Sequence, residues 1–286
     1  MLLQAYDRTH TYTAKVRSIT RITADESPDD VKEIILDVEG PEFQYEIGQL
    51  VGVLVPGPHA LGHEQHFRLY SLTEMPSRTA DNRHTITLLV KRCNYIDEYS
   101  GEEYKGIASN YLCDLIPGQD ITITGPYGLP FEVPEDNTSN ILMIGLGTGI
   151  APFRAFVKHI YHTIGDWQGK VRLFYGARTG MEMLYMNDHR NDFANYYDET
   201  TFAAFQAISS RPEWKEDADL TQALNVHEQE IWDLLCSYNT YVYVAGLSSI
   251  SSMLDEAFSK MAGSSEKWKR RKKELLAGRR WTELLY

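Results

Sequence analysis

The stretch Asn140-Ile141-Leu142-Met143-Ile144-Gly145-Leu146-Gly147-Thr148-Gly149-Ile150-Ala151-Pro152 decides how the second half of this chain folds. Its apolar start, residues 140–144, predicts a strand that runs into a glycine-rich turn and then into a helix over residues 151–162. Glycines let a ligand approach the backbone, and a helix N-terminus offers unpaired N–H groups with a partial positive charge. The stretch therefore suits a pyrophosphate. Its spacing departs from the GxGxxG dinucleotide pattern, so a glycine turn that serves packing alone is the competing interpretation.

The residues that follow this stretch alternate between strand and helix. Further strands are expected at residues 171–175, 202–208 and 240–244, and further helices at residues 227–237, 253–261 and 267–276. Alternation of this kind predicts a parallel, doubly wound sheet. The segment Pro134-Glu135-Asp136-Asn137 marks the change in character, and we place the domain boundary after residue 136.

The residues before this boundary have the pattern of a β domain. Stretches rich in β-branched and aromatic residues lie at residues 12–22, 31–38, 49–55, 85–90 and 120–124. Turn clusters such as Pro56-Gly57-Pro58 and Pro117-Gly118 separate them, and residues 109–115 predict a short capping helix. Several short strands with turn signals favour a barrel or a sandwich. We therefore expect a two-domain chain, with a β domain followed by an α/β domain.

Composition restricts the class of protein. The chain has 286 residues, which suggests two domains, and 43% hydrophobic with 24% charged residues is an ordinary globular composition. No apolar run approaches the roughly 18 residues that a membrane helix needs, and the N-terminus lacks the features of a secretory signal. The cysteines Cys93, Cys113 and Cys236 are widely spaced, which excludes a disulfide framework and a CxxC-type metal or iron–sulfur site. We expect a protein of the reducing cytoplasm that holds no metal.

Charge is distributed unevenly along the chain. Lys and Arg number 28 and Asp and Glu number 40, so the net charge is −12, which argues against non-specific binding of nucleic acid. Residues 267–280 are the exception, with eight basic residues and one acidic residue, a net charge of +7 that leaves −19 for the remainder. This basic segment is either a solvated helix face or a docking patch for an acidic partner.

Two shorter motifs lie in the first half. In Arg68-Leu69-Tyr70-Ser71, strand alternation sends Arg68 and Tyr70 to one face, where the guanidinium can bind a phosphate and the ring can stack on a planar group. In Lys105-Gly106-Ile107-Ala108-Ser109-Asn110, a glycine and a serine at a helix start combine N–H groups with a hydroxyl, again a phosphate cradle. Each motif is weak alone, because Arg68 can be a surface residue and Ser109 a plain helix N-cap.

In combination, and in this order along the chain, the three motifs resemble those of the plant-type ferredoxin–NADP⁺ reductases. The third is Gly147-Thr148-Gly149-Ile150-Ala151-Pro152-Phe153-Arg154, and the likeness extends from Tyr45-Glu46-Ile47-Gly48-Gln49 to the C-terminal Trp281-Thr282-Glu283-Leu284-Leu285-Tyr286. The resemblance implies an antiparallel β-barrel FAD-binding domain at residues 1–136 and an NAD(P)-binding α/β domain at residues 137–286. It also implies an oxidoreductase that exchanges a hydride with NADP(H) and single electrons with a ferredoxin-type iron–sulfur protein. Because the chain has no cysteine cluster, that carrier, a ferredoxin or a flavodoxin-like protein, must be a separate partner.

The resemblance also assigns roles in FAD binding. Arg68 is expected to pair with the pyrophosphate, Tyr70 to stack on one face of the isoalloxazine, and Ser71 to lie near its N5 atom. Tyr95 is expected to stack on the adenine. Tyr286 is expected to cover the second flavin face until the nicotinamide displaces it, and Ser71 and Tyr286 are the expected catalytic residues. The full set expected to bind FAD is Arg68, Leu69, Tyr70, Ser71, Leu89, Val90, Lys91, Tyr95, Ile107, Ala108, Ser109, Thr148 and Tyr286.

The nucleotide site is assigned in the same way. Ser210-Arg211 matches the family's Ser-Arg pair, whose donors suit a 2′-phosphate. No Tyr occurs between Arg211 and Ser237, so Trp214 is the candidate to stack on the adenine, the alternative being a surface or core indole. These donors favour NADP, with NAD as the alternative nucleotide. The full set expected to bind NADP is Lys91, Thr148, Gly149, Ala177, Arg178, Ser210, Arg211, Lys215, Gly246 and Leu247.

Two positions depart from the family's pattern. Ala245-Gly246-Leu247 stands where the family often has Cys-Gly-Leu, and Leu284 stands where the family has a relay Glu, with Glu283 one step earlier. Hydride transfer belongs to the cofactors, so these changes bear on the rate and direction of turnover rather than on its chemistry. Two further functions stay open: the NADPH-fed reductase component of an oxygenase, and a flavin-binding regulatory or assembly subunit with reduced turnover.

Overall fold

The computed structural model describes residues 3–59, 64–96, 101–128, 131–210 and 219–286. Its contacts divide the chain into two compact units, Met1–Leu129 and Pro130–Tyr286. The boundary expected from the sequence, after residue 136, falls inside the second unit. The expected order, an antiparallel β unit followed by an α/β unit with a parallel sheet, is confirmed.

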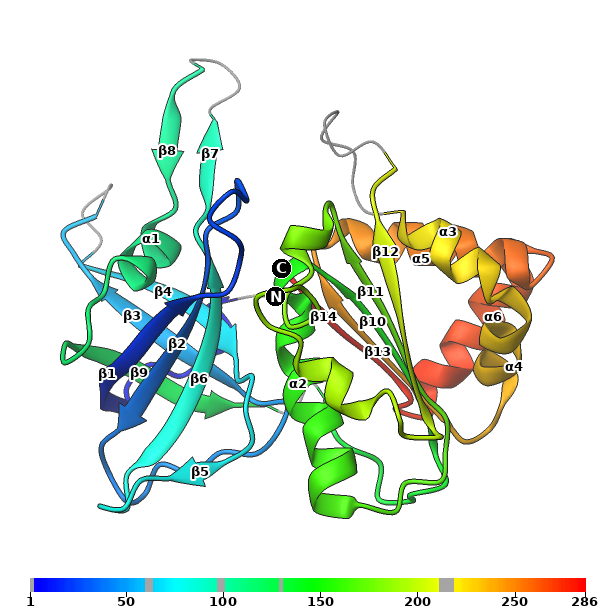
Figure 1. Ribbon diagram of the computed structural model, residues 1–286, viewed down its shortest axis with the longest axis horizontal. Helices are drawn as coiled ribbons and strands as arrows, with labels where there is room; N and C mark the ends of the chain where they lie inside the picture. Colours follow the sequence, from blue (N-terminus) through cyan, green and yellow to red (C-terminus); the bar gives the residue numbers. More distant parts are fainter. Residues whose placement is uncertain (1–2, 60–63, 97–100, 129–130, 211–218) are drawn as a thin grey trace. The chain divides into compact units, whose positions relative to one another are not determined.

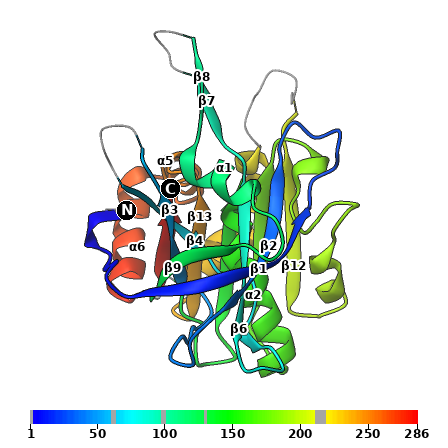
Figure 2. The ribbon, with the colours of Figure 1, turned by 90° about the vertical axis from the view of Figure 1, so that its left-hand side faces the viewer.

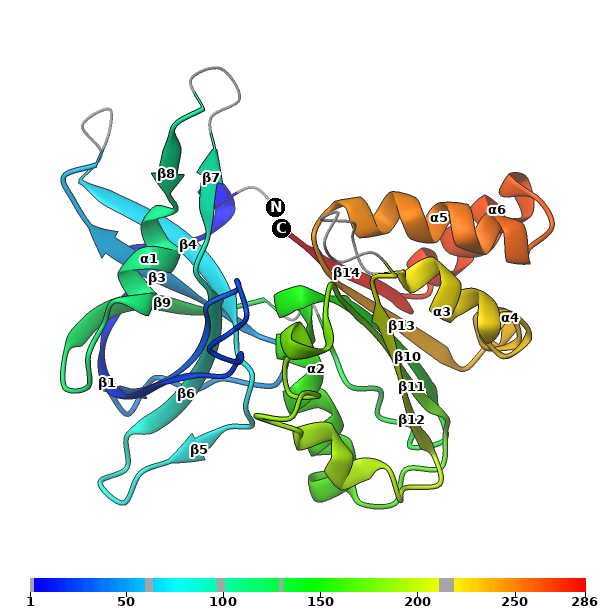
Figure 3. The same ribbon diagram turned by 45° about the horizontal axis from the view of Figure 1, so that its top comes forward.

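The first unit is built on a seven-stranded antiparallel sheet. In the order of pairing, its strands are β4 (Gln65–Ser71), β3 (Leu50–Pro56), β9 (Asp120–Tyr127), β1 (Thr11–Arg21), β2 (Val31–Val38), β6 (His84–Lys91) and β5 (Ser77–Arg78). Leu72, directly after β4, forms an isolated bridge with Leu88 of β6, and this bridge joins one edge of the sheet to the strand next to its other edge. The sheet therefore curls into a barrel (Figure 3).

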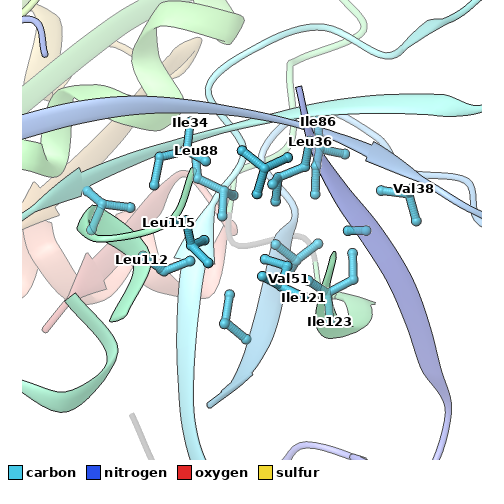
Figure 4. Packing of buried hydrophobic residues seen from close by; sticks show 14 of the residues in the cluster. Ile34, Leu36, Val38, Val51, Ile86, Leu88, Leu112, Leu115, Ile121 and Ile123 are labelled. Carbon is cyan, nitrogen blue, oxygen red and sulfur yellow. The ribbon is translucent and has the colours of Figure 1, made fainter. Parts of the chain in front are cut away.

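The barrel closes around a core of aliphatic side chains (Figure 4). Alternate residues of β2, Ile34 and Leu36, are fully buried there and pair across the sheet with Leu88 and Ile86 of β6. The helix α1 (Ile107–Cys113) adds side chains to the same cluster. Each fully buried aliphatic side chain stabilises the fold by about 1.5–3 kcal/mol, so this core fixes the strands on which the candidate residues lie.

After β6 the chain leaves the barrel as a two-stranded ribbon, β7 (Asn94–Ile96) and β8 (Glu103–Lys105), whose residues are all exposed. Figures 1 and 2 show this ribbon projecting from the barrel. Since β8 leads directly into α1, one continuous segment supplies the end of β6, the ribbon and the helix start. Apart from β4, this segment holds the residues of the first unit that were expected to bind FAD.

The second unit is a five-stranded parallel sheet with helices on both faces. The strands pair in the order β12 (Phe202–Ile208), β11 (Val171–Ala177), β10 (Asn140–Leu146), β13 (Thr240–Gly246) and β14 (Trp281–Leu285). One face is covered by α2 (Ile150–Lys158), and the other by α3 (Leu220–Val226), α4 (Glu228–Cys236), α5 (Ser249–Met261) and α6 (Ser265–Ala277) (Figure 1). The strand order reverses between β10 and β13. Doubly wound sheets bind ligands at the carboxyl ends of the strands beside such a reversal.

Two further findings concern what the described ranges contain. None of the helices within them is long and apolar enough to cross a membrane. Within the same ranges, no group of three or more His, Cys, Asp or Glu side chains could hold a metal ion. The cytoplasmic location expected from the sequence stays a prediction.

Candidate functional site

The first group of expected residues lies on β4. Arg68 is exposed, and its guanidinium donates to the carbonyl of the neighbouring Phe67 at 3.3 Å. Tyr70 lies on the same face of the strand and packs against the barrel core. Burial raises the pKa of the Tyr70 phenol, so its hydroxyl stays protonated near neutral pH. Leu69 and Ser71, half-buried, lie on the opposite face of the strand.

The end of β6 presents fewer free side chains to a ligand than the resemblance implies. The side chains of Leu89 and Val90 are buried, so these two residues can present only their backbone to a ligand. The Lys91 ammonium, expected to contact both FAD and NADP, is ion-paired with the carboxylate of Asp29. Lys91 therefore needs to exchange that partner before it can bind a phosphate.

The turn into α1 is closely packed. The N–H of Gly106, the N-cap residue, donates to the carbonyl of Cys93 at 2.8 Å. A Cβ atom at Gly106 would lie 2.8 Å from that carbonyl oxygen and 2.9 Å from the hydroxyl of Ser109, so glycine alone fits. Ser109 is therefore not the N-cap that the sequence left open. It lies in the first turn of α1 with Ile107 and Ala108, and its hydroxyl accepts the N–H of Cys93 at 3.1 Å.

Two residues without an assigned role in the sequence hold this turn in place. The Arg92 guanidinium donates to Asp30 at 2.9 Å, to the Asn110 amide oxygen at 2.9 Å and to Asp114 at 2.8 Å. The Asn110 amide in turn donates to the carbonyls of Cys93 at 3.0 Å and of Gly106 at 2.9 Å. These bonds tie α1 to the end of β6. Both residues stand beside expected ones in the sequence, yet spacing alone does not reveal that they pair.

The ribbon presents an aromatic platform. Tyr95 is 59% exposed and stacks on Tyr104 of the neighbouring strand, with 5.4 Å between ring centroids and 18° between ring planes. Tyr104 was not expected to take part, and only the register of β7 against β8 places it opposite Tyr95. An exposed stacked ring, an exposed guanidinium and a closed turn at a helix start suit the adenine and the phosphates of FAD in their chemistry.

In the second unit, the candidate site is the turn Gly147–Gly149, at the carboxyl end of β10. A Cβ atom at Gly149 would lie 2.2 Å from the carbonyl oxygen of Ala245 on β13, which is backbone and cannot move aside. Gly246 has a φ of +144°, a conformation that only glycine adopts without strain. The packing explanation therefore holds for Gly149. It does not compete with ligand binding, because close packing is what fixes the turn in place.

The C-terminal residue contacts this turn, as its expected role requires. The hydroxyls of Tyr286 and Thr148 are hydrogen-bonded at 2.6 Å. The backbone of Tyr286 donates to the carbonyl of Gly246 at 3.1 Å and accepts from the N–H of Ser248 at 3.2 Å. The side chain remains 56% exposed. The main chain is thus fixed, while the ring can move by rotation of its side-chain bonds.

Four other residues expected to bind NADP, Ala177, Arg178, Ser210 and Leu247, follow or end strands at the same edge of the sheet. Ala177 ends β11, and the Arg178 side chain pairs with Glu182 at 2.9 Å. Ser210 is exposed two residues after β12, and Leu247, 53% exposed, follows β13 directly. Arg211, Trp214 and Lys215 lie outside the residues that the structure describes.

Glu283 does not take the place of the missing relay Glu. On β14, Leu284 is buried and pairs with Ala245 of β13. Strand alternation places its side chain on the same face as that of Tyr286. Glu283 points to the other face, where it accepts from the Trp281 indole at 2.6 Å and pairs with Lys272 at 3.3 Å. A shift of one residue along a strand reverses the face, so both family positions are apolar here.

Comparisons with known proteins agree with this arrangement. Residues 143–256 match the family model described as the oxidoreductase NAD-binding domain. The chain is 34% identical to the chloroplastic ferredoxin–NADP reductase, leaf isozyme 1, of Oryza sativa subsp. indica, across 96% of this chain and 76% of the relative. It is 30% identical to the ferredoxin–NADP reductase of Spirulina sp, across 96% of this chain and 95% of the relative. The solved ferredoxin–NADP⁺ reductase from Plasmodium falciparum has the same fold, with a TM-score of 0.71 over 98% of both chains at 18% identity.

Proposed function

Because this chain belongs to the ferredoxin–NADP⁺ reductase family, we propose that it exchanges a hydride with NADP(H) and single electrons with a ferredoxin-type iron–sulfur protein. The coarser activity follows from the family: the chain is an NADP-linked flavin oxidoreductase with FAD as its cofactor. The observation that carries the finer proposal is an exposed basic helix face on an otherwise acidic chain.

We assign FAD to the first unit. When bound, FAD supplies the conversion between two-electron hydride chemistry and one-electron transfer. The Arg68 guanidinium forms charge-assisted hydrogen bonds to the pyrophosphate, together with the N–H groups of the first turn of α1. Tyr70 offers the flavin a half-buried ring that packs against the barrel core, and Ser71 follows it at the end of the same strand. Tyr95 on the ribbon accepts the adenine.

We assign NADP to the carboxyl ends of the strands in the second unit. The turn Gly147–Gly149 and the start of α2 receive its pyrophosphate, and Ser210 with Arg211 receives its 2′-phosphate. When NADP binds, we propose that its nicotinamide ring displaces the Tyr286 ring. Its release breaks one hydrogen bond to Thr148, a net cost of about 1 kcal/mol, so a nicotinamide ring can replace it.

Six of the eight basic residues of α6 and the following turn divide into two groups of three. Arg271 and Arg280 donate to the carbonyl of Ser237, after α4, at 2.8 and 3.1 Å. Lys272 pairs with Asp255 of α5 at 2.9 Å. These three cations hold the helix in the fold, and we do not count them as a docking surface.

The second group is Lys269, Arg270 and Lys273, which we call the basic face. All three are exposed, and spacings of three and four residues place them on one side of the helix. Arg270 pairs with Glu274 at 3.3 Å, yet its side chain is 84% exposed. The remainder of the chain repels an acidic partner at long range, but screening over about 8 Å lets this local face dominate at contact. An acidic ferredoxin is the partner whose charge it complements.

The experiment reverses all three residues of the basic face to Glu. The association rate with ferredoxin at low ionic strength should fall about tenfold and lose most of its salt dependence. NADPH-dependent reduction of ferricyanide, which needs no protein docking, should stay within twofold of wild type. The matched control reverses Lys15, Lys170 and Lys260, which are exposed elsewhere, and so gives the same change in net charge. Equal ferredoxin kinetics for the two triple variants would reduce the basic face to a solvated surface.

One observation favours a second function, a flavin-binding regulatory subunit with slow turnover. Ala245 and Leu284 pair in the sheet at the positions where the family has its thiol and its relay carboxylate, and both are buried and apolar. Bleaching of the flavin by NADPH separates the two functions. Rapid bleaching followed by ferredoxin-dependent reduction of cytochrome c supports the reductase. Bleaching without it points to another acceptor such as an oxygenase, and absence of bleaching supports the regulatory subunit.

A further inference from the structure

Tyr175 of β11 is a fully buried residue whose hydroxyl lies beneath the glycine turn of the second unit. The hydroxyl donates to the carbonyl of Gly147 at 2.9 Å and accepts from the backbone N–H of Leu184 at 3.2 Å. It therefore links the turn to the segment that follows β11. Burial raises the pKa of this phenol, so its proton stays on the oxygen and the bond to Gly147 keeps its direction.

The ring reaches the turn because the neighbouring strand leaves room for it. Tyr175 pairs with Gly145 of β10, and a Cβ atom at Gly145 would lie 3.6 Å from the Tyr175 ring and 3.1 Å from the Phe153 ring. A side chain at that position would press on the Phe153 ring and fill the space beside the Tyr175 ring.

The bond from Tyr175 sets the orientation of the peptide between Gly147 and Thr148. Its carbonyl also accepts the N–H of Ile150 at the start of α2, so both acceptor positions of the oxygen are used inside the protein. In a trans peptide the N–H points opposite to the C=O. The N–H of Thr148 is therefore directed away from Tyr175. The side chain of the same residue carries the hydrogen bond to Tyr286.

The second partner of the Tyr175 hydroxyl, the N–H of Leu184, lies in a segment that is held by several contacts. Tyr185, next to Leu184, is buried with the guanidinium of Arg154 at 4.8 Å from its ring centroid and that of Arg190 at 5.7 Å. Both arginines donate to Asp192, at 2.6 and 2.9 Å. The N–H of Leu184 consequently holds the Tyr175 hydroxyl at a fixed point.

We propose that Tyr175 is a positioning residue for NADP(H): it fixes the Gly147–Thr148 peptide so that the turn presents its N–H to the nucleotide phosphate. The proposal rests on the function proposed above, in which this turn binds the nucleotide. Without the hydroxyl, the peptide gains freedom to rotate, and the turn is competent to bind for only part of the time. Affinity then falls with the competent fraction, while the bound complex reacts as before.

The test compares Tyr175→Phe with Tyr243→Phe. Tyr243 lies on β13 of the same sheet, is equally buried, and its hydroxyl also donates to a backbone carbonyl, that of Glu132, away from the turn. Tyr175→Phe loses two buried hydrogen bonds and Tyr243→Phe loses one, so we expect both melting temperatures to fall, that of Tyr175→Phe by more. NADP⁺ is then titrated calorimetrically into the purified, FAD-loaded proteins. We expect Kd to rise about three- to tenfold for Tyr175→Phe and to change less than about twofold for Tyr243→Phe.

Steady-state kinetics with ferricyanide give an independent readout. For Tyr175→Phe the KM for NADPH should rise while kcat at saturating NADPH stays within about twofold of wild type, which general loosening of the fold would not produce. Equal NADP⁺ affinity in Tyr175→Phe and wild type, or equal losses in the two variants, would overturn the proposal. A wild-type protein that binds no NADP⁺ would overturn the proposed function and this inference with it.

Discussion

The turn at Gly106 in the first unit and the turn Gly147–Gly149 in the second offer the same feature, a helix N-terminus after a strand, but they are held differently. Hydrogen bonds from the half-buried side chain of Arg92 and the buried side chain of Asn110 hold the first, in addition to the backbone bond from Gly106 to Cys93. Backbone packed against backbone, with a single buried phenol beneath it, holds the second.

The difference predicts how each turn responds to change. Several side-chain bonds contribute separately, so their loss should weaken the first turn in graded steps. A backbone contact cannot be partly relieved, so a single added methyl group should disable the second turn outright. We assign the two turns to different cofactors, so their losses should be separable by measuring FAD and NADP⁺ binding on the same variant.

The largest effect is expected for Gly149→Ala. The new Cβ atom would lie 2.2 Å from the Ala245 carbonyl oxygen, so α2 must shift away from β13. We expect a loss of about 3 kcal/mol in the free energy of unfolding and of measurable NADP⁺ binding, with FAD retained. Urea unfolding and calorimetric titration check this. Gly180→Ala is the control, because its nearest atom would be 3.9 Å away and its stability should change by less than about 0.5 kcal/mol.

Arg92→Met is expected to have the next largest effect. It keeps the length of the side chain and removes the bonds to Asp30, Asn110 and Asp114. Since hydrogen bonds to charged groups contribute about 1.5–3 kcal/mol and exposed Asp114 adds little, we expect a loss of about 2 kcal/mol with faster release of FAD. NADP⁺ affinity should not change. Arg92→Lys can keep one of these partners, so its loss of stability should lie between zero and that of Arg92→Met. If the two variants lose the same stability, the graded description of this turn is wrong.

Much of the fold could be predicted from the sequence because its signals are local. The apolar strand before Gly145, the glycine turn and the helix after it are consecutive, and together they predict the doubly wound sheet. The strand β14 and the helix α3 were not predicted. The strand is a five-residue edge element that pairs with β13 far back in the chain, and α3 has only seven residues. The apolar residues of these two segments are too few and too irregularly spaced to indicate a strand or a helix by themselves.

The residues of the candidate site, too, could be predicted from the sequence only in part. The resemblance gave Tyr286 and Thr148 separate roles beside the flavin, and that their hydroxyls are hydrogen-bonded at 2.6 Å comes from the structure. Tyr175 could not be found, because its role depends on the register of β11 against Gly145 and on a contact made by its hydroxyl. The face of Glu283 could have been deduced: strand alternation places it opposite to the face that leads to Tyr286.

Tyr286→Ser should have a smaller effect on NADP⁺ binding at the second turn, and it should raise the affinity that Gly149→Ala lowers. Removing the ring abolishes its competition with the nicotinamide, so NADP⁺ should bind about tenfold more tightly, as expected for one aromatic stack. Discrimination against NADH should weaken as well. Tyr286→Phe keeps the ring and loses only the bond to Thr148, so its affinity should stay within about threefold of wild type. If Phe and Ser act alike, the hydrogen bond rather than the ring controls access.

The smallest effect is expected for Ser109→Ala in the first turn. The hydroxyl accepts the N–H of Cys93 at 3.1 Å and has longer contacts to the carbonyls of Gly106 at 3.4 Å and Cys93 at 3.5 Å, all between neutral groups, whereas the charged Arg92 guanidinium donates to three partners. A bond of that kind contributes about 0.5–1 kcal/mol, so stability should fall by that amount and FAD affinity by less than about fivefold.

The Ser109 hydroxyl is also one of two groups that a Cβ atom at Gly106 would contact, at 2.9 Å, and Ser109→Ala removes this contact. In the Ser109→Ala background, Gly106→Ala should still be strongly destabilising, since the Cys93 carbonyl at 2.8 Å is backbone. Urea unfolding of the single and double variants separates the two contacts. A loss for Ser109→Ala as large as that for Arg92→Met would mean that the first turn, like the second, fails as one unit, and the contrast between them would not hold.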